Sequence, residues 1–179
     1  QIAGNKGKGS TSTYLANILT AAGYRCGLFV SPHIRRENER VSIDGQQIPD
    51  ADLQRLLAQT TESGYFRKFY QVALAWFAEQ GVEVAVMETG LGGRYDPATR
   101  LPICQLILTR IGMDHMEILG DTIQKIALEK AAAIRLSGSV VSAPQDARVQ
   151  RIFDATCRLR HARQSSVCAQ EICVREDGS

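Results

Sequence analysis

A glycine-rich stretch near the start of the chain has the composition of a phosphate-binding loop. It reads Gly4-Asn-Lys-Gly-Lys-Gly-Ser-Thr11 and lies between a short apolar segment and an amphipathic helical pattern. Backbone N–H groups at such a turn point toward an anion, and the dipole of the following helix adds to the attraction. Lys8 could reach a terminal phosphate, and Ser10 or Thr11 offers a hydroxyl to phosphate or Mg²⁺. The spacing departs from the strict G-x4-G-K-[ST] pattern, so a turn that only caps a helix stays open as an alternative.

Further along the chain, three more residues have side chains suited to chemistry. Glu88 directly follows an apolar β-branched run, where a Mg²⁺-binding carboxylate is expected in a protein with a phosphate loop; the alternative is a surface residue on a loop. His115 follows Asp114 after another apolar run, although imidazole is an unusual Mg²⁺ ligand and the pair could simply cap a turn. Lys130 lies close to the apolar face of a predicted helix. Burial would leave it as a neutral, reactive amine, whereas the simpler interpretation is a lysine that extends to solvent.

The elements that must position these residues alternate between strand and helix. Apolar runs predict strands at 2–3, 25–30, 82–87, 103–111 and 140–141. Apolar periodicity and end signals predict helices after the glycine-rich stretch to 22, from 49 to 57, at 65–80, at 121–135 with Asp121 as cap, and at 145–160. The charged segment 34–48 has a turn signal at Asp44-Gly45 and predicts a loop with a small hairpin. This order predicts an α/β fold with a parallel sheet flanked by helices on both sides.

The predicted strand ends bring the polar residues together. Ligands of open parallel sheets bind outside the carboxyl ends of the strands. Residues of this kind follow four of the predicted strands: Lys8, Ser10, Ser31, His33, Glu88, Asp114 and His115. We therefore expect them to share one edge of the sheet.

Composition narrows the class of protein. The chain has 179 residues and a net charge of +2, which suits one globular domain and gives no argument for nucleic acid or an anionic membrane surface. No apolar run is long enough to span a membrane, and no secretory leader is visible. The five cysteines form no C-x-x-C pair, which is typical of reduced thiols in the cytosol. We expect a cytoplasmic monomer that binds small molecules.

The order of the motifs resembles that of the folylpolyglutamate synthases, which include the bifunctional dihydrofolate synthases and belong to the Mur ligase superfamily. The resemblance runs from about Ile2 to about Pro144 and is carried by Gly4–Thr11, Ser31-Pro-His33, Asn38–Val41, Glu88–Arg94 with Asp96, Asp114-His115 with Leu119–Thr122, and Glu129-Lys-Ala131. It implies that residues 1–160 are a P-loop ATP-binding domain like the central domain of Mur ligases. Residues 161–179, which show little periodicity, would be a tail or the connection to a C-terminal domain that this chain lacks.

The resemblance also implies a chemistry, which is ATP- and Mg²⁺-dependent amide formation. Enzymes of this family phosphorylate a substrate carboxylate, and the amine of L-glutamate attacks the acyl phosphate. By resemblance, the ATP phosphates would be held by Gly7, Lys8, Gly9, Ser10 and Thr11. One Mg²⁺ would be bound by Ser31 and Glu88 and a second by Glu88 and His115, and Lys130 would be carried as a carbamate. Folate or dihydropteroate would contact His33, Arg40, Tyr65, Phe66, Tyr95 and Asp96.

Several positions depart from the family pattern. Asn5 and Lys6 replace the usual Thr-Asn of the loop, Arg67 replaces a glutamate after two aromatics, and Pro97 follows Asp96 where the family has alanine. The ATP and metal motifs are better kept than the folate-contacting ones. Another amino-acid ligase of the Mur type and a non-catalytic nucleotide-binding module therefore stay open. The family's C-terminal domain contributes nucleotide and glutamate contacts, so the chain alone is not expected to complete ligation.

Overall fold

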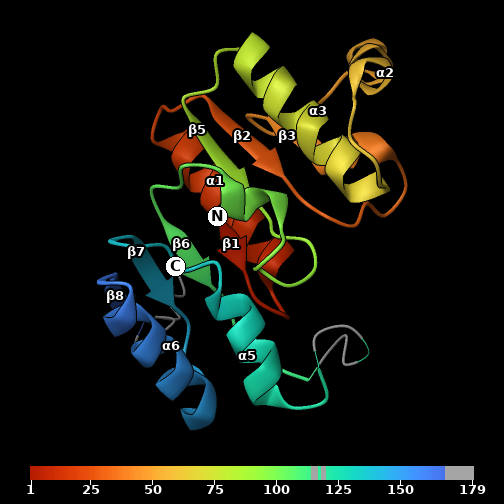
Figure 1. Cartoon of the computed structure of the whole chain (residues 1–179). Coiled ribbons are helices and arrows are strands. Elements are labelled where there is room, and N and C mark those ends of the chain that lie inside the picture. Colours follow the sequence, from red (N-terminus) through yellow and green to blue (C-terminus); the bar gives the residue numbers. More distant parts are fainter. Residues whose placement is uncertain (114–116, 118–119, 168–179) are drawn as a thin grey trace, which may run out of the picture.

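The computed structural model describes residues 1–113, 117 and 120–167. Its strands are β1 (Ile2–Ala3), β2 (Cys26–Phe29), β3 (Val41–Ile43), β4 (Gln46–Gln47), β5 (Val84–Met87), β6 (Leu106–Leu108), β7 (Ser139–Ser142) and β8 (Arg163–Ser166). Its helices are α1 (Lys8–Ala21), α2 (Asp50–Gln59), α3 (Tyr65–Glu79), α5 (Ile123–Ala131) and α6 (Ala147–Leu159), with short 3₁₀ helices η1 (Glu37–Arg40) and η2 (Pro97–Arg100). Figure 1 shows these elements arranged around a twisted sheet.

Two four-stranded sheets meet at β1. One has the order β1-β6-β7-β8 and is parallel throughout; the other has the order β4-β3-β2-β5. A parallel bridge between Ile2 and Glu88 links them, and Thr89 N–H donates to the Ile2 carbonyl at 2.9 Å. The chain leaves β1 toward β2 on one side and later crosses to β6 on the other. The carboxyl ends of β1 and β5 therefore form the switch point at which open α/β sheets bind ligands.

The predicted hairpin at 34–48 is confirmed and extends one edge of the sheet. β3 pairs antiparallel with β2, and β4 pairs antiparallel with β3 around the turn at Asp44-Gly45. Both turn residues have positive φ (49° and 78°), which suits an aspartate followed by a glycine. The sheet is consequently mixed rather than wholly parallel.

Helices cover both faces, as the alternation of strand residues requires. On one face, Ile2 and Val86 pack with Ala16 of α1. On the other face, their neighbours in sequence point the opposite way: Met87 packs in a cluster with α2 and α3, and Ala3 packs in a cluster with α5 and α6. In Figure 1, α2 and α3 lie over the β2–β5 half of the sheet, and α5 and α6 over the β6–β8 half.

Several sequence expectations are corrected in detail. Thr122, not Asp121, caps α5: its Oγ1 accepts from Lys125 N–H at 3.3 Å, while Asp121 pairs with the Lys125 ammonium at 2.9 Å. The predicted strand at 103–111 is limited to Leu106–Leu108, and α5 ends at Ala131 rather than near residue 135. Past residue 160, four polar residues form β8, which pairs in parallel with β7. Backbone pairing with β7 therefore makes a strand where the side-chain pattern predicts none.

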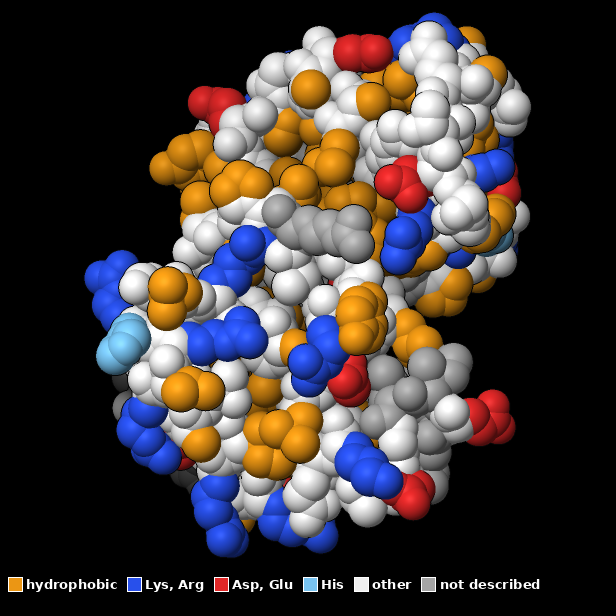
Figure 2. Space-filling view, in the orientation of Figure 1, with side chains coloured by type: hydrophobic (Ala, Val, Ile, Leu, Met, Phe, Trp, Pro, Cys, Tyr) orange, Lys and Arg blue, Asp and Glu red, His pale blue; other side chains and the backbone are white. Residues whose placement is uncertain are grey.

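Hydrophobic and basic side chains are distributed unevenly over the surface. Figure 2 shows hydrophobic side chains gathered over the upper part of one face and Lys and Arg side chains spread over the lower part. Among the described residues, no helix is long and apolar enough to cross a membrane. Cys26, Cys104 and Cys157 are free thiols; Cys168 and Cys173 lie outside the described residues.

Candidate functional site

The glycine-rich stretch forms the predicted strand–turn–helix. Gly7 has a φ of 80° and is the N-cap of α1, so the helix begins at Lys8 and its first N–H groups lie in the loop. Gly4 has a φ of 148°, and a Cβ there would lie 2.0 Å from Thr109 Oγ1. Only glycine fits at that point, because the loop passes directly over the end of β6. The arrangement can hold an anion at a helix N-terminus.

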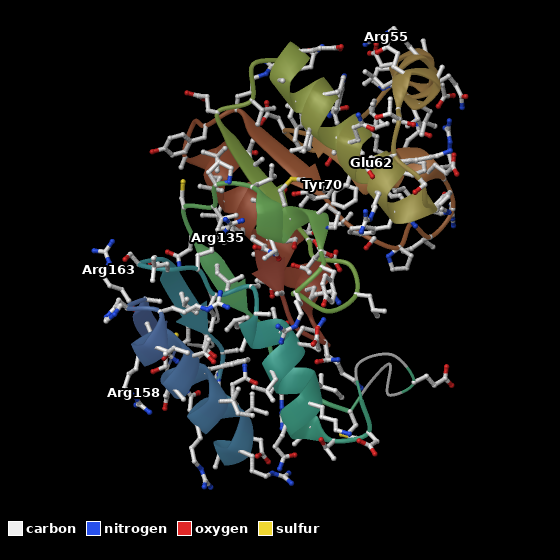
Figure 3. The ribbon with its side chains drawn as sticks, in the orientation of Figure 1. Arg55, Glu62, Tyr70, Arg135, Arg158 and Arg163 are labelled. Carbon is white, nitrogen blue, oxygen red and sulfur yellow. The ribbon has the colours of Figure 1, made fainter. Side chains whose placement is uncertain are left out.

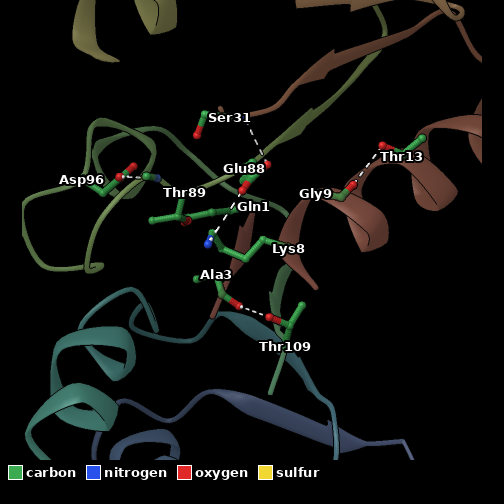
Figure 4. Close-up of polar contacts among 11 residues, drawn as sticks. Gln1, Ala3, Lys8, Gly9, Thr13, Ser31, Glu88, Thr89, Asp96 and Thr109 are labelled. Carbon is green, nitrogen blue, oxygen red and sulfur yellow. Dashed lines mark hydrogen bonds and ion pairs between the residues drawn. The ribbon is translucent and has the colours of Figure 1, made fainter. Parts of the chain in front are cut away.

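Glu88 lies opposite this loop, as Figure 4 shows. The residue is 2% exposed, and Lys8 Nζ lies 3.8 Å from its Oε1. The backbone N–H of Ser31 donates to its Oε2 at 3.1 Å. Burial raises the pKa of Glu88, and the Ser31 hydrogen bond and the positive charges of Lys8, Arg40 and Lys130 oppose the rise. The carboxyl ends of β1, β2 and β5 thus bring together Lys8, Ser31 and Glu88, as the sequence predicts.

Lys130 is buried, which excludes the interpretation of a lysine that extends to solvent. The residue is 2% exposed, and its positive charge opposes the rise that burial causes in the pKa values of Glu88 and Asp96. α5 therefore places this cation on the same side of the sheet as the two buried carboxyl groups. Whether it carries a carbamate stays a prediction.

Asp96 closes the loop that follows Glu88. Its two carboxylate oxygens accept hydrogen bonds from the backbone N–H groups of Gly90 (2.8 Å) and Ala98 (2.9 Å), and the residue is 4% exposed. Burial raises its pKa against these hydrogen bonds. The structure thus gives this carboxylate a role within the loop; its contact with substrate stays a prediction.

The same loop is seated on α5 and on the segment behind it. A Cβ at Gly93 would lie 2.7 Å from the Glu129 carbonyl oxygen and 3.1 Å from that of Lys130. Thr99 Oγ1 donates to the Gly93 carbonyl at 2.6 Å, and Arg135 donates to the Thr99 carbonyl. Burial, together with the charge of Asp96, raises the pKa of Tyr70 of α3, and the positive charge of Arg135 opposes the rise; both side chains are labelled in Figure 3. These contacts fix the loop against the element that carries Lys130.

The expected substrate-contacting residues have different environments. Tyr65 and Tyr95 are 49% and 75% exposed, while Phe66 is partly buried and packs edge-on against Phe29. Arg40 is buried and donates from Nε to His33 Nδ1 at 2.9 Å. His115 and Asp114 lie outside the described residues.

Sequence reasoning missed residues that act through the backbone. Gln145 accepts from Ile111 N–H at 2.9 Å and donates to the Thr109 carbonyl at 3.1 Å, which fixes the chain after β6. The contacts of Gly93 and Arg135 were not predicted either, because a close approach between distant segments leaves no local pattern. The glycine pair in Gly90-Leu-Gly-Gly93 is the only sequence signal that could have suggested Gly93.

An apolar cavity of about 440 Å³ lies away from this chemistry. It is lined by residues at the amino ends of β5 and β6, among them Val84 and Gln105, together with Leu15, Leu19 and Leu74. Neither Lys8 nor Glu88 lines it. The candidate site is therefore the polar edge at the carboxyl ends of the strands, not this cavity.

Known proteins are similar to this chain in sequence and in fold. Folylpolyglutamate synthase of Arabidopsis thaliana is 38% identical over 167 residues, which cover 86% of this chain and 29% of that protein. The dihydrofolate synthase/folylpolyglutamate synthase of Bacillus subtilis (strain 168) is 39% identical over 155 residues, which cover 79% of this chain and 36% of that protein. The chain is homologous to part of the folylpolyglutamate synthases. No protein-family model matches it.

The fold agrees with this family. The solved structure of Mycobacterium tuberculosis folylpolyglutamate synthase complexed with ADP matches with a TM-score of 0.86 at 30% identity, covering 92% of this chain and 41% of that one. The chain thus spans about a third of the length of the curated relatives it matches.

Proposed function

We propose that this chain provides the nucleotide-binding part of an ATP-dependent ligase that adds L-glutamate to the carboxylate of folate or dihydropteroate through an acyl phosphate. The observation that carries the proposal is the meeting of Lys8, Ser31 and Glu88 at the switch point of the sheet. The names of the family members supply the substrate class.

The donor set around Glu88 fits Mg²⁺. Its carboxylate and the nearby Ser31 hydroxyl are hard oxygen ligands, which Mg²⁺ prefers together with water and substrate phosphates. Glycine at position 9 leaves room before the carboxylate, because a Cβ there would lie 3.5 Å from Glu88 Oε2. No group of three His, Cys, Asp or Glu among the described residues could hold a metal ion, so Ser31 and Glu88 would supply only part of the ligands. When bound, Mg²⁺ would neutralise phosphate charge during phosphoryl transfer.

The chain's own residues would bind and orient the nucleotide. The N–H groups at Lys8, Gly9 and Ser10 would hold the phosphates at the start of α1, while the Thr11 N–H donates to the Gly7 carbonyl at 2.9 Å; Lys8 would move from Glu88 to a terminal phosphate. Glu88 is held by the Ser31 N–H, so it would keep its position when Lys8 leaves. The ammonium of Lys8 would then stabilise the charge that develops on the transferred group.

The test is ADP release by the full-length protein with MgATP, L-glutamate and either dihydropteroate or a reduced folate. We expect release that depends on the pterin, and a loss of about 10²–10³-fold in kcat for Lys8→Ala and for Glu88→Gln. Lys125→Ala and Glu79→Gln are matched controls, since both side chains form exposed surface ion pairs.

Each alternative gives a different result. ADP release that needs another carboxylate in place of a pterin would favour a different Mur-type ligase, the possibility raised by the cation at Arg67. Nucleotide binding without release by any carboxylate would favour a non-catalytic module. Full turnover in Lys8→Ala would favour the alternative in which the glycine-rich loop is only a turn that caps the helix. A cytoplasmic location, a monomeric state and a separate C-terminal domain stay predictions.

A further inference from the structure

Arg40 at the end of η1 is buried instead of reaching into the open site. The residue is 7% exposed. Its guanidinium carbon lies 4.9 Å from the ring centroid of Tyr65 and 5.4 Å from that of Phe69, both on α3. A desolvated guanidinium over aromatic faces is held firmly by cation–π attraction. The positive charge of Arg40 therefore lies over the rings of α3, and it also opposes the rise that burial causes in the pKa of Glu88.

The polar contact of Arg40 is with one nitrogen of His33. Arg40 Nε–H donates to His33 Nδ1 at 2.9 Å. A guanidinium always donates, and a ring nitrogen that accepts a hydrogen bond carries no proton. The proton of the neutral imidazole must then reside on Nε2, on the far side of the ring. We propose that Arg40 is a positioning residue that fixes His33 as the Nε2–H tautomer and presents this N–H to an anionic oxygen of the substrate.

The surrounding segment keeps this arrangement rigid. Glu39 accepts hydrogen bonds from the backbone N–H groups of Ile34 (2.7 Å), Arg35 (3.0 Å) and Arg36 (2.9 Å). Tyr65, whose ring lies under the guanidinium, donates from its hydroxyl to Glu37 at 2.5 Å. The loop between His33 and Arg40 is thus tied on itself and to α3, and the imidazole is held by its hydrogen bond from Arg40. A donor fixed in this way loses little entropy when it meets a ligand.

The position of His33 indicates which oxygen it meets. It is half-buried and lies two residues after Ser31, whose N–H donates to Glu88 at the candidate site. The ligand is thus a carboxylate or phosphoryl oxygen next to the phosphate loop. Under the proposed function, on which this assignment rests, the best candidate is the substrate carboxylate that becomes phosphorylated.

The test combines NMR with steady-state kinetics on the full-length protein. Long-range ¹⁵N–¹H spectra of histidine-labelled protein distinguish the two tautomers, and His33→Gln assigns the signal. Arg40→Lys keeps the positive charge but removes the Nε–H that contacts the imidazole. We expect the wild type to show the Nε2–H tautomer, and Arg40→Lys to show a mixture of tautomers. The KM for the acceptor substrate should rise about tenfold or more, with the KM for ATP changed less than about twofold.

Arg36→Lys is the matched control. Arg36 lies on the same segment, its side chain is 62% exposed, and it pairs with Asp50. This variant should leave both the His33 signal and the KM values unchanged. An Nδ1–H tautomer in the wild type overturns the proposal, and so does an unchanged His33 signal in Arg40→Lys.

The NMR measurement also separates this inference from the proposed function. If no folate or pterin supports ADP release, the proposed function fails while the tautomer measurement still decides the role of Arg40. If Arg40→Lys does not fold, the tautomer in the wild type decides alone. A mixture of tautomers in Arg40→Lys without any rise in the acceptor KM would overturn the assignment of His33 as a substrate donor.

Discussion

Replacing Asp96 by asparagine tests how the loop after Glu88 is held. Asparagine has one carbonyl oxygen in place of two carboxylate oxygens, so it can keep only one of the hydrogen bonds from Gly90 and Ala98. Its NH₂ group would face the other backbone N–H. An unsatisfied buried donor costs about 1–3 kcal/mol. Removal of a buried charge offsets part of this cost, because burial raises the pKa of Asp96. We expect a net loss of about 1–2 kcal/mol in the free energy of unfolding.

Urea unfolding at 25 °C measures this loss, and Asp146→Asn is the matched control. Asp146 caps α6 through the same contact, a carboxylate that accepts a backbone N–H two residues on, but it is exposed and pairs with Arg148. Its replacement should therefore cost less than that of Asp96. An equal or smaller loss for Asp96→Asn would refute the assignment of Asp96 as the residue that closes the loop.

The pH dependence of the same variant follows from the raised pKa of Asp96. Between the ordinary aspartate value of 3.8 and the raised value, the folded state binds more protons than the unfolded state. Wild-type stability therefore falls as the pH rises through this window. Asparagine lacks this contribution, so the deficit of Asp96→Asn should shrink as the pH rises. A deficit that grows from pH 4 to pH 7 would contradict the buried-carboxylate interpretation.

Three further predictions follow from single contacts. Gly93→Ala should lower the free energy of unfolding by about 1–3 kcal/mol, because the new methyl group would meet the α5 backbone at 2.7 Å; an unchanged thermal midpoint would contradict this. Burial raises the pKa of Glu88 above 4.5, so wild-type stability should fall as the pH rises from 4.5 to the raised value. The urea midpoint of Glu88→Gln should therefore change less with pH than that of the wild type. Thr122→Ala should cost about 1 kcal/mol of stability because it removes a helix cap. Asp121→Ala should cost less, because Asp121 does not cap α5. If thermal unfolding shows the larger loss for Asp121→Ala, Asp121 is the cap, as the sequence predicts.

Features encoded in local pattern were predictable from the sequence. The glycine-rich loop, the β-branched run before Glu88 and the turn at Asp44-Gly45 each carry a backbone requirement within a few residues. Because parallel strands end at the same edge of a sheet, the proximity of Lys8, Ser31 and Glu88 could be predicted without knowledge of side-chain contacts. The geometry of this half of the site therefore follows from strand order.

Features that depend on tertiary contacts were not predictable. β8 has the sequence Arg-Gln-Ser-Ser and forms only because β7 offers it a backbone partner. The contact of Arg40 with substrate stays a prediction, but its packing against the rings of Tyr65 and Phe69 on α3 was not predictable from local pattern. A side chain's direction depends on what packs beside it, and these partners lie more than twenty residues away in the sequence. Local periodicity carries no record of them.

The two halves of the candidate site differ in how firmly they are built. Glu88 and Lys130 are each 2% exposed, and Glu88 is held by a backbone hydrogen bond. In contrast, Tyr65 and Tyr95 are largely exposed, and Arg67 lies on the surface 4.0 Å from Glu62. Substitution of an exposed residue costs little stability, so Tyr65, Tyr95 and Arg67 can change more readily than Glu88 and Lys130. The departure from the family pattern at Arg67 falls among these exposed residues, whereas those at Asn5 and Lys6 lie in the glycine-rich loop itself.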